Sequence, residues 1–202
     1  MPSSYSKFTN YEDLKALGIE VRNKRISREA IAIEPTNWLR DTLLMNSKLP
    51  LATEKAKSEL IVVPILTELV TRNNYAFTYF SGYTFNVDKA QGLVGACDFL
   101  LSTEVDTPMI AAPIISVVEA KRDNLDNGIP QCIAQMYAAQ LFNIEAKSDV
   151  TTIYGAVSTG GTWQFLYLKE KAAFIDTQVF YINQDLPELL GAFQQIIDFY
   201  IK

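Results

Sequence analysis

The chain has 202 residues, of which 49% are hydrophobic and 20% charged, proportions that predict one globular domain with a sizeable core. It contains no histidine, which excludes hydrolases with a histidine base, histidine zinc sites and nucleases of the HNH type. The net charge of −5 argues against a protein that coats nucleic acid non-specifically, but it leaves room for a small catalytic interface built around acids.

The chain begins with a polar segment that resembles neither a secretory leader nor a membrane anchor. The most apolar stretch, residues 58–70, is interrupted by Glu59 and Glu68 and is too short to span a membrane. We therefore expect a cytoplasmic protein that does not enter the membrane. Cys97 and Cys132 have apolar neighbours, which favours buried free thiols over a disulfide or a zinc site.

Residues 1–50 are predicted to form a helical extension that covers one side of the core. Residues 10–18 indicate a short helix that ends at a glycine. Residues 23–35 and 36–47 also look helical, and a proline separates the two segments. No residue type or spacing in this extension indicates chemistry, so its expected role is to cover the core.

A longer helix is predicted over residues 53–72. At 100° per residue its apolar side chains form one face, with Glu59 in the middle of that face and Glu68 on the opposite side. A carboxylate on a packed face needs a partner, whereas an exposed one does not. We therefore expect Glu59 to be the acid of this helix that reaches a functional site.

The rest of the chain alternates between strands and helices and predicts an α/β fold with a mixed sheet. Two β-rich runs joined by a turn indicate a hairpin, and the third run is apolar on both faces and should be central. A helix, two strands around a Gly-Gly turn, a short strand and an amphipathic closing helix follow. The ranges are 75–88, 92–102 and 109–120 for the first three strands, 127–143 for the helix, 150–169 for the next two strands, and 169–202 for the last strand and closing helix.

The tripeptide Glu-Ala-Lys occurs twice, at residues 119–121 and 145–147. The first copy ends the expected central strand, where residues i and i+2 share a face, so Glu119 and Lys121 should point the same way. Burying both charges is costly unless they are paired or bind something. The second copy lies between a helix and a polar connection, where its charges should be solvated. Only the first copy is therefore a candidate for chemistry.

Asp98 lies among apolar residues in the strand that precedes Glu119. It could simply pair with a lysine, but next to Glu119 it would create a pair of neighbouring carboxylates. At about 4 Å and an effective dielectric constant of about 20, two carboxylates repel each other by about 4 kcal/mol. Either one retains a proton or a cation lies between them, and a divalent ion with oxygen ligands fits best.

Two glutamines, Gln131 and Gln135, are spaced i, i+4 on the helix that follows, which is otherwise apolar nearly all round. They could be a pair of satisfied core amides. Alternatively, they face the acid cluster and hold a water molecule, a phosphate or Lys121.

These residues together resemble the PD-(D/E)XK nuclease superfamily. The resemblance rests on Glu59 in a helix, "GACDF" in a strand, "VVEAK" in the next and "QCIAQ" in the helix after it, and the sequence looks like a group of bacterial, often cyanobacterial, members. It implies a restriction-endonuclease-like α-β-β-β-α-β core over residues 53–168, flanked within a single domain by the extension of residues 1–50 and by residues 169–202. Cys97 stands where the motif has proline.

The resemblance also implies a metal site. Asp98, Glu119 and the backbone carbonyl of Ala120 would bind Mg²⁺ or Mn²⁺, and Glu59 would bind a second ion or a metal-bound water. Lys121 would orient the attacking water and favour its ionised form. The reaction would be in-line hydrolysis of a phosphodiester.

In this family-based scheme Gln131 would support the phosphate or the lysine, and the substrate would be nucleic acid, with DNA favoured. One alternative is a non-catalytic binding or regulatory module that keeps the fold, which the acidic charge and the lack of a recognisable added DNA-binding domain favour. Another is a metal-dependent hydrolase of a different phosphate ester. A homodimer is compatible with each of these readings.

Overall fold

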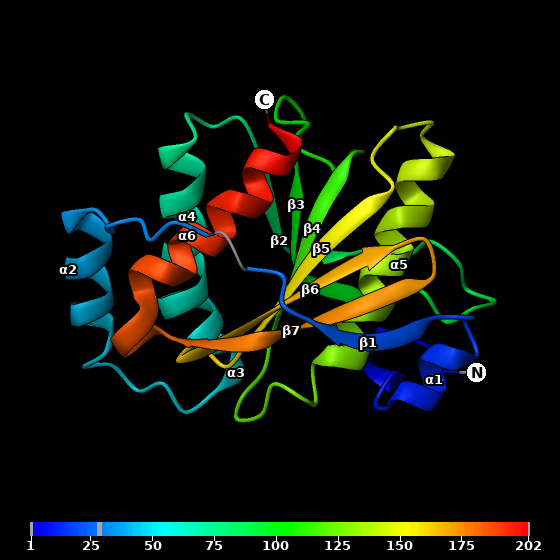
Figure 1. Cartoon of the computed structure of the whole chain (residues 1–202), viewed down its shortest axis with the longest axis horizontal. Helices are drawn as coiled ribbons and strands as arrows, with labels where there is room; N and C mark the ends of the chain where they lie inside the picture. Colours follow the sequence, from blue (N-terminus) through cyan, green and yellow to red (C-terminus); the bar gives the residue numbers. More distant parts are fainter. Residues whose placement is uncertain (1, 28–29, 202) are drawn as a thin grey trace.

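The structure, a computed structural model, describes residues 2–27 and 30–201 and is built around a seven-stranded mixed sheet (Figure 1). Its strands are β1 (Glu20–Lys24), β2 (Thr78–Thr84), β3 (Ala96–Ser102), β4 (Ile114–Ala120), β5 (Thr152–Ser158), β6 (Thr162–Lys169) and β7 (Ala172–Tyr181). They lie in the order β1-β7-β6-β5-β4-β3-β2. The β1–β7 and β4–β5 pairs are parallel, and the other neighbours are antiparallel. The predicted mixed α/β class is confirmed.

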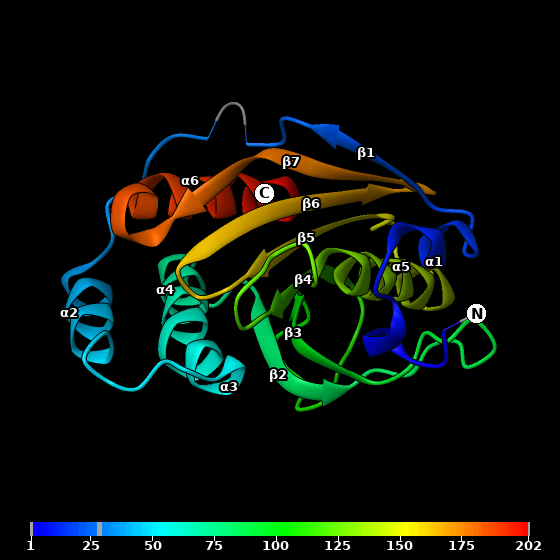
Figure 2. The same cartoon turned by 90° about the horizontal axis from the view of Figure 1, so that it is seen from below.

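Helices cover both faces of the sheet, and Figure 2 shows the sheet between the two layers of helices. The helical segments are η1 (Tyr5–Lys7), α1 (Tyr11–Lys15), α2 (Asn37–Asn46), α3 (Glu54–Lys57), η2 (Ser58–Val62), α4 (Val63–Arg72), α5 (Ile129–Glu145) and α6 (Ile182–Tyr200). One hydrophobic cluster joins the sheet to α5, η1 and α1, and a second joins it to α2, α4 and α6. None of the helices within the described residues is long and apolar enough to cross a membrane.

Strand β4 lies inside the sheet, between β3 and β5, as its uninterrupted apolar sequence predicts. All seven of its residues are buried, including Glu119. Helix α5 forms the crossover between β4 and its parallel neighbour β5, and it packs against both strands. This unit places the end of β4 beside the beginning of α5.

The order from α3 to β5 is helix, three strands, helix and strand, as the sequence predicts for the middle of the chain. The helix predicted over residues 53–72 is present, but it consists of α3, the π-helical η2 and α4 in direct succession. The final strand, β7, has 10 residues and is therefore longer than the short strand predicted there.

Residues 1–50 are not wholly helical, which corrects the prediction for this part of the chain. Helices α1 and α2 match predicted helices, but β1 is the edge strand of the sheet and pairs with β7. Of the helix predicted over residues 23–35, the first two residues belong to β1 and the remaining described residues are not helical. Residues 28–29 of that prediction lie outside the described residues.

Contacts with the C-terminal part of the chain explain why this segment is extended. The buried Asp176 carboxylate of β7 accepts hydrogen bonds from the backbone N–H of Ser27 at 3.0 Å and from its hydroxyl at 2.7 Å. The Ile33 N–H donates to the Pro187 carbonyl of α6 at 2.8 Å. These tertiary bonds outweigh the helical propensity of the segment, which is a weak local preference.

Candidate functional site

Glu119 and Lys121 form a buried ion pair where β4 ends. The Lys121 Nζ lies 2.6 Å from the Glu119 Oε1, and the two side chains are only 16% and 1% exposed. Two amides of α5 complete the pair, because Lys121 donates to the Gln131 Oε1 at 3.1 Å and the Gln135 Nε2 donates to the Glu119 Oε2 at 2.9 Å. Of the two alternatives left open for the glutamines, the structure therefore matches the one in which both face the acid cluster.

Asp98 reaches the same place from β3. The paired residues of β3 and β4 end at Phe99 and Val118, and beyond them the Ala120 N–H donates to the Asp98 Oδ2 at 2.8 Å. A side-chain carboxylate thus replaces a backbone carbonyl as the acceptor for this strand N–H. The arrangement brings Asp98 to the end of β4, beside the strand that carries Glu119.

Two cavities flank these residues. One, of about 250 Å³, is lined by Asp98, Ala120 and Glu59, together with residues of α3 and β2. The other, of about 510 Å³, is lined by Lys121 and by residues of the loop that follows it. Glu54, at the beginning of α3, lines both cavities. Asp98 and Lys121 thus each face a cavity, whereas Glu119 lines neither.

Burial sets the electrostatics of the two acids. Desolvation and the negative charge of Asp98 raise the pKa of Glu119 to about 8, although Lys121 and Gln135 oppose this shift. Desolvation also raises the pKa of Asp98, against the hydrogen bond that it accepts from Ala120. The cluster therefore favours a bound proton or a cation, as two neighbouring carboxylates predict.

Lys121 remains an ammonium in this setting. Burial by itself would lower its pKa, but the adjacent Glu119 carboxylate and the charges of Glu54 and Asp98 outweigh burial and raise the pKa above its usual value. A raised pKa keeps the side chain positively charged at neutral pH. Lys121 can thus stabilise negative charge, and it is not a neutral amine base.

Sequence reasoning overlooked Glu54. Its charge influences the pKa values of both Asp98 and Lys121, and it lines both cavities. The Thr53 hydroxyl caps α3 by accepting a hydrogen bond from the Ala56 N–H at 3.0 Å, which fixes the first turn beside the acid cluster. In the sequence, the only feature that sets Glu54 apart from other acids is its place directly after the N-cap residue Thr53, in the first turn of α3.

The prediction that Glu59 lies on the packed face of its helix is wrong. Its side chain is 61% exposed and lies 3.8 Å from the Lys55 ammonium. It nevertheless lines the smaller cavity together with Asp98. Glu59 therefore stands at the edge of the candidate site, and its predicted contact with a second ion stays a prediction.

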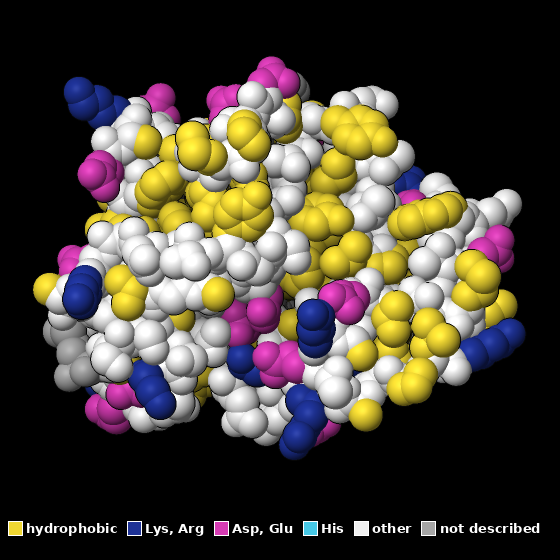
Figure 3. All heavy atoms as spheres, turned by 180° about the vertical axis from the view of Figure 1, so that it is seen from behind, with side chains coloured by type: hydrophobic (Ala, Val, Ile, Leu, Met, Phe, Trp, Pro, Cys, Tyr) yellow, Lys and Arg dark blue, Asp and Glu magenta, His cyan; other side chains and the backbone are white. Residues whose placement is uncertain are grey.

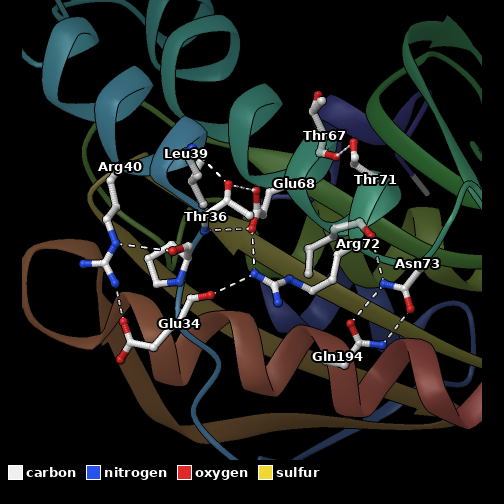
Figure 4. Close-up of polar contacts among 12 residues, drawn as sticks. Glu34, Thr36, Leu39, Arg40, Thr67, Glu68, Thr71, Arg72, Asn73 and Gln194 are labelled. Carbon is white, nitrogen blue, oxygen red and sulfur yellow. Dashed lines mark hydrogen bonds and ion pairs between the residues drawn. The ribbon is translucent and has the colours of Figure 1, made fainter.

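Glu68, which was expected to be exposed, is the buried acid of this helical region, with 3% of its side chain exposed (Figure 4). It accepts hydrogen bonds from the Thr36 N–H at 3.1 Å and hydroxyl at 2.6 Å, and pairs with Arg72 at 2.7 Å. For Glu59 the cause of the error is η2, because a π-helical turn has more residues than an α-helical turn and shifts a face counted at 100° per residue. Glu68 lies in the regular helix α4, where Pro64 and Ile65 are buried as well as Leu66 and Leu69, so the buried surface of α4 extends to the side that carries Glu68.

The second Glu-Ala-Lys copy behaves as predicted, because Glu145 and Lys147 are both exposed. Cys97 and Cys132 are buried free thiols, also as predicted. The structure thus distinguishes the two copies of the tripeptide by burial: one lies among partners at the end of β4, and the other lies at the surface where α5 ends.

No known protein-family model matches this sequence. A search of curated proteins likewise finds no significant match. The candidate site must therefore be assessed from its own residues.

The site meets some of the requirements of a hard divalent cation, namely oxygen ligands, but its described residues do not include a group of three or more ligating side chains. Among residues 2–27 and 30–201, no group of three or more His, Cys, Asp or Glu side chains is arranged to hold a metal ion. Asp98, Glu119 and the Ala120 carbonyl nevertheless supply oxygen donors of the kind that Mg²⁺ and Mn²⁺ prefer. Mg²⁺ is usually bound by one or two carboxylates with water and substrate phosphates, so two acids are sufficient.

Proposed function

We propose that the protein is a divalent-metal-dependent nuclease of the PD-(D/E)XK type with a restriction-endonuclease-like core. The observation that carries the proposal is the buried Glu119–Lys121 pair at 2.6 Å, with Asp98 bonded to the intervening Ala120 at 2.8 Å. Buried charges with shifted pKa values beside open cavities are typical of active sites. The element order from α3 to β5 is consistent with the same family.

In this proposal, Lys121 acts on the water that attacks phosphorus. An ammonium has three N–H donors, and the bonds to Glu119 and Gln131 occupy two of them. The third can bind the attacking water or a phosphate oxygen. Because Lys121 stays positively charged, it stabilises the hydroxide-like water and the negative charge that builds up on the phosphate.

Asp98, Glu119 and the Ala120 carbonyl would hold Mg²⁺ or Mn²⁺, and Glu59 at the cavity edge would contact a second ion or its water. A divalent cation bound there supplies positive charge beside the phosphate oxygens and makes a water molecule more acidic. Burial and, after it, the charge of Asp98 raise the pKa of Glu119, and a bound cation would offset both effects, which supports this assignment.

Nucleic acid, with DNA favoured, is the substrate that we propose. The larger cavity combines the cationic side chains of Lys121 and Arg122 with the amides of Asn124 and Asn127, groups that bind phosphate and sugar oxygens. A cytoplasmic location and a homodimer belong to the same proposal.

A non-catalytic binding or regulatory module is the second candidate. The specific observation in its favour is that Glu59 is exposed and paired with Lys55, so only Asp98 and Glu119 are acids within the buried cluster. In such a module, Glu119, Lys121 and Gln135 would serve as a structural hydrogen-bond network. This candidate predicts nucleic-acid or protein binding without cleavage.

The two candidates are separated by incubating plasmid, linear duplex DNA, single-stranded DNA and RNA with the protein and Mg²⁺, Mn²⁺ or EDTA. The nuclease proposal predicts cleavage of at least one polymer with a metal ion, no cleavage in EDTA, and loss of cleavage in Asp98→Asn. Cleavage that persists in Asp98→Asn would exclude the Asp98–Glu119–Lys121 site as the source of the activity. If no polymer is cleaved under any condition, the binding module is the better description.

A further inference from the structure

The backbone conformation of Gly128, the N-cap residue of α5, does not require glycine. Its φ of −94° and ψ of −22° are accessible to any residue. Glycine is acceptable at an N-cap, but Ser, Asn or Asp stabilises a helix somewhat more, and no side chain caps this end of α5. The space around Gly128 therefore decides whether a side chain could be accommodated there.

The constraint is the space around the glycine. A Cβ at Gly128 would lie 2.6 Å from the Val157 Cγ1, 2.9 Å from the Lys121 Cγ and 3.3 Å from the Lys121 Cε. The alkyl chain of Lys121 thus passes directly over the N-cap residue of α5. Val157 restricts the same space from β5, where it is the register partner of Glu119.

We propose that Gly128 is a positioning residue. Because it has no side chain, the alkyl chain of Lys121 can pass over it, and the ammonium can reach Glu119 and Gln131. Gln131 lies three residues further along α5, so the same helix start provides both the passage and an acceptor for the ammonium. Any side chain at Gly128 would push the lysine stem away from this acceptor. The catalytic consequence of this inference rests on the proposed nuclease function.

The test begins with Gly128→Ala in the full chain. A displaced Lys121 loses partners and becomes more accessible, so its labelling by an amine-acylating reagent, measured by mass spectrometry relative to the other lysines, should increase several-fold. In metal-dependent cleavage, kcat should fall by about 10- to 100-fold, since small misplacements of a reacting group have effects of this size. KM should change little, because the lysine acts on the attacking water.

Gly161→Ala is the matched control, because a Cβ at Gly161 would meet no atom within 4 Å. This variant should match the wild type in Lys121 labelling and in cleavage. The double variant Gly128→Ala/Val157→Ala removes the contact with Val157 but leaves the contact with Lys121. It should regain melting temperature relative to Gly128→Ala while its kcat stays low.

The inference is overturned if Gly128→Ala keeps wild-type labelling and kcat, or if Val157→Ala restores both in the double variant, since then Val157 alone explains the glycine. Labelling also separates this inference from the proposed function. If the wild type cleaves no polymer but Gly128→Ala still exposes Lys121, the positioning role stands and the nuclease proposal fails.

Discussion

Glu68 and Glu119 are both almost fully buried carboxylates, yet their pKa values shift in opposite directions. For Glu68, burial is outweighed by hydrogen bonds from Thr36 and by Arg72, so the pKa is lowered. For Glu119, burial and the neighbouring Asp98 outweigh Lys121 and Gln135, so the pKa is raised to about 8. The lowered pKa of Glu68 is that of a carboxylate stabilised by its partners, whereas the raised pKa of Glu119 near two cavities is consistent with the proposed site.

Glu68→Gln should lower the free energy of unfolding at pH 7 by about 1–3 kcal/mol, because hydrogen bonds to a buried charged group are lost or weakened. The lowered pKa sets the sign of the pH dependence. The contribution of Glu68 is fully present above the usual glutamate pKa of 4.5 and is lost as the pH falls through the lowered folded-state value. Urea unfolding of the wild type and of Glu68→Gln, at several pH values from about 3 to about 7, measures this difference in the free energy of unfolding.

Glu12→Gln is the control for this experiment, since the Glu12 side chain is 78% exposed in its pair with Lys15. It should leave the unfolding curve nearly unchanged. A Glu68→Gln variant that equals the wild type at pH 7, or whose deficit grows as the pH falls below the usual glutamate pKa, would contradict the account of Glu68.

At the scale of single residues, the sequence predicts the part of the site that lies on strands and on α5. Glu119 and Lys121 share a face because a strand repeats every two residues, and Gln131 and Gln135 share one because α5 is a regular helix. The predicted position of Glu59 is wrong because it assumes 100° per residue, whereas Glu59 lies in the π-helical turn η2.

At the scale of elements, the segment of residues 30–36 lies across α6 without helical structure, where the sequence predicts a helix as far as residue 35. Its crossing point is Gly191, where an added Cβ would lie 2.0 Å from the Ile31 carbonyl oxygen and 2.7 Å from the carbonyl carbon. The segment is held further along by the Ile33–Pro187 hydrogen bond and by the bonds of Thr36 to Glu68. Contact with α6 therefore requires a glycine within that helix.

Gly191→Ala should destabilise the protein even though alanine is the better helix former by about 1 kcal/mol. The clash is with backbone atoms of Ile31, which cannot rotate away, so the segment must lift from α6. We expect the free energy of unfolding to fall by about 1–3 kcal/mol, as in overpacked cores. Thermal unfolding measures the loss, and limited proteolysis within residues 30–36 shows whether the segment has lifted.

Gly161→Ala again provides a control without a clash and should stay within about 0.5 kcal/mol of the wild type. A rise in stability for Gly191→Ala would show that helix propensity decides at this position and that the segment does not lie against α6 as described.

Strand β1 shows why some elements could not be predicted. Only Val21 of its five residues is half-buried and the others are exposed, so the strand lacks the alternation of apolar and polar residues that identifies a strand in a sequence. It forms because β7 offers a free edge for parallel pairing. The strands β3 to β6, by contrast, carry their own apolar patterns and lie where the sequence predicts them.

At the scale of the whole molecule, the order of elements from α3 onward is predictable, but the pairing of an N-terminal strand with a C-terminal strand is not. The sheet places the N-terminal β1 beside β7, an association of distant segments that no local pattern encodes. The central unit of β4, α5 and β5 is predictable, because an apolar strand, a buried helix and a second strand form a parallel crossover. Glu119, Lys121 and both glutamines of the candidate site lie on this unit, whereas Asp98 comes from β3.

Charge on the whole molecule limits how it can hold nucleic acid. The chain has 18 basic and 23 acidic residues, and Figure 3 shows basic side chains scattered among acidic and hydrophobic ones on the face that it draws. Broad electrostatic attraction to phosphates is therefore weak. In the proposed function, affinity comes from the few cationic and amide groups around Lys121 and from the bound metal ion.

The central claim is that Lys121 at the end of β4 carries chemistry, and the exposed Lys147 of the second Glu-Ala-Lys copy offers a control within the same chain. The decisive measurement is the Mg²⁺-dependent cleavage rate of Lys121→Met beside Lys147→Met and the wild type. The account predicts a loss of at least about 100-fold for Lys121→Met, within the range for a group acting on proton transfer, and no loss for Lys147→Met. Equal metal-dependent rates in all three proteins would contradict it.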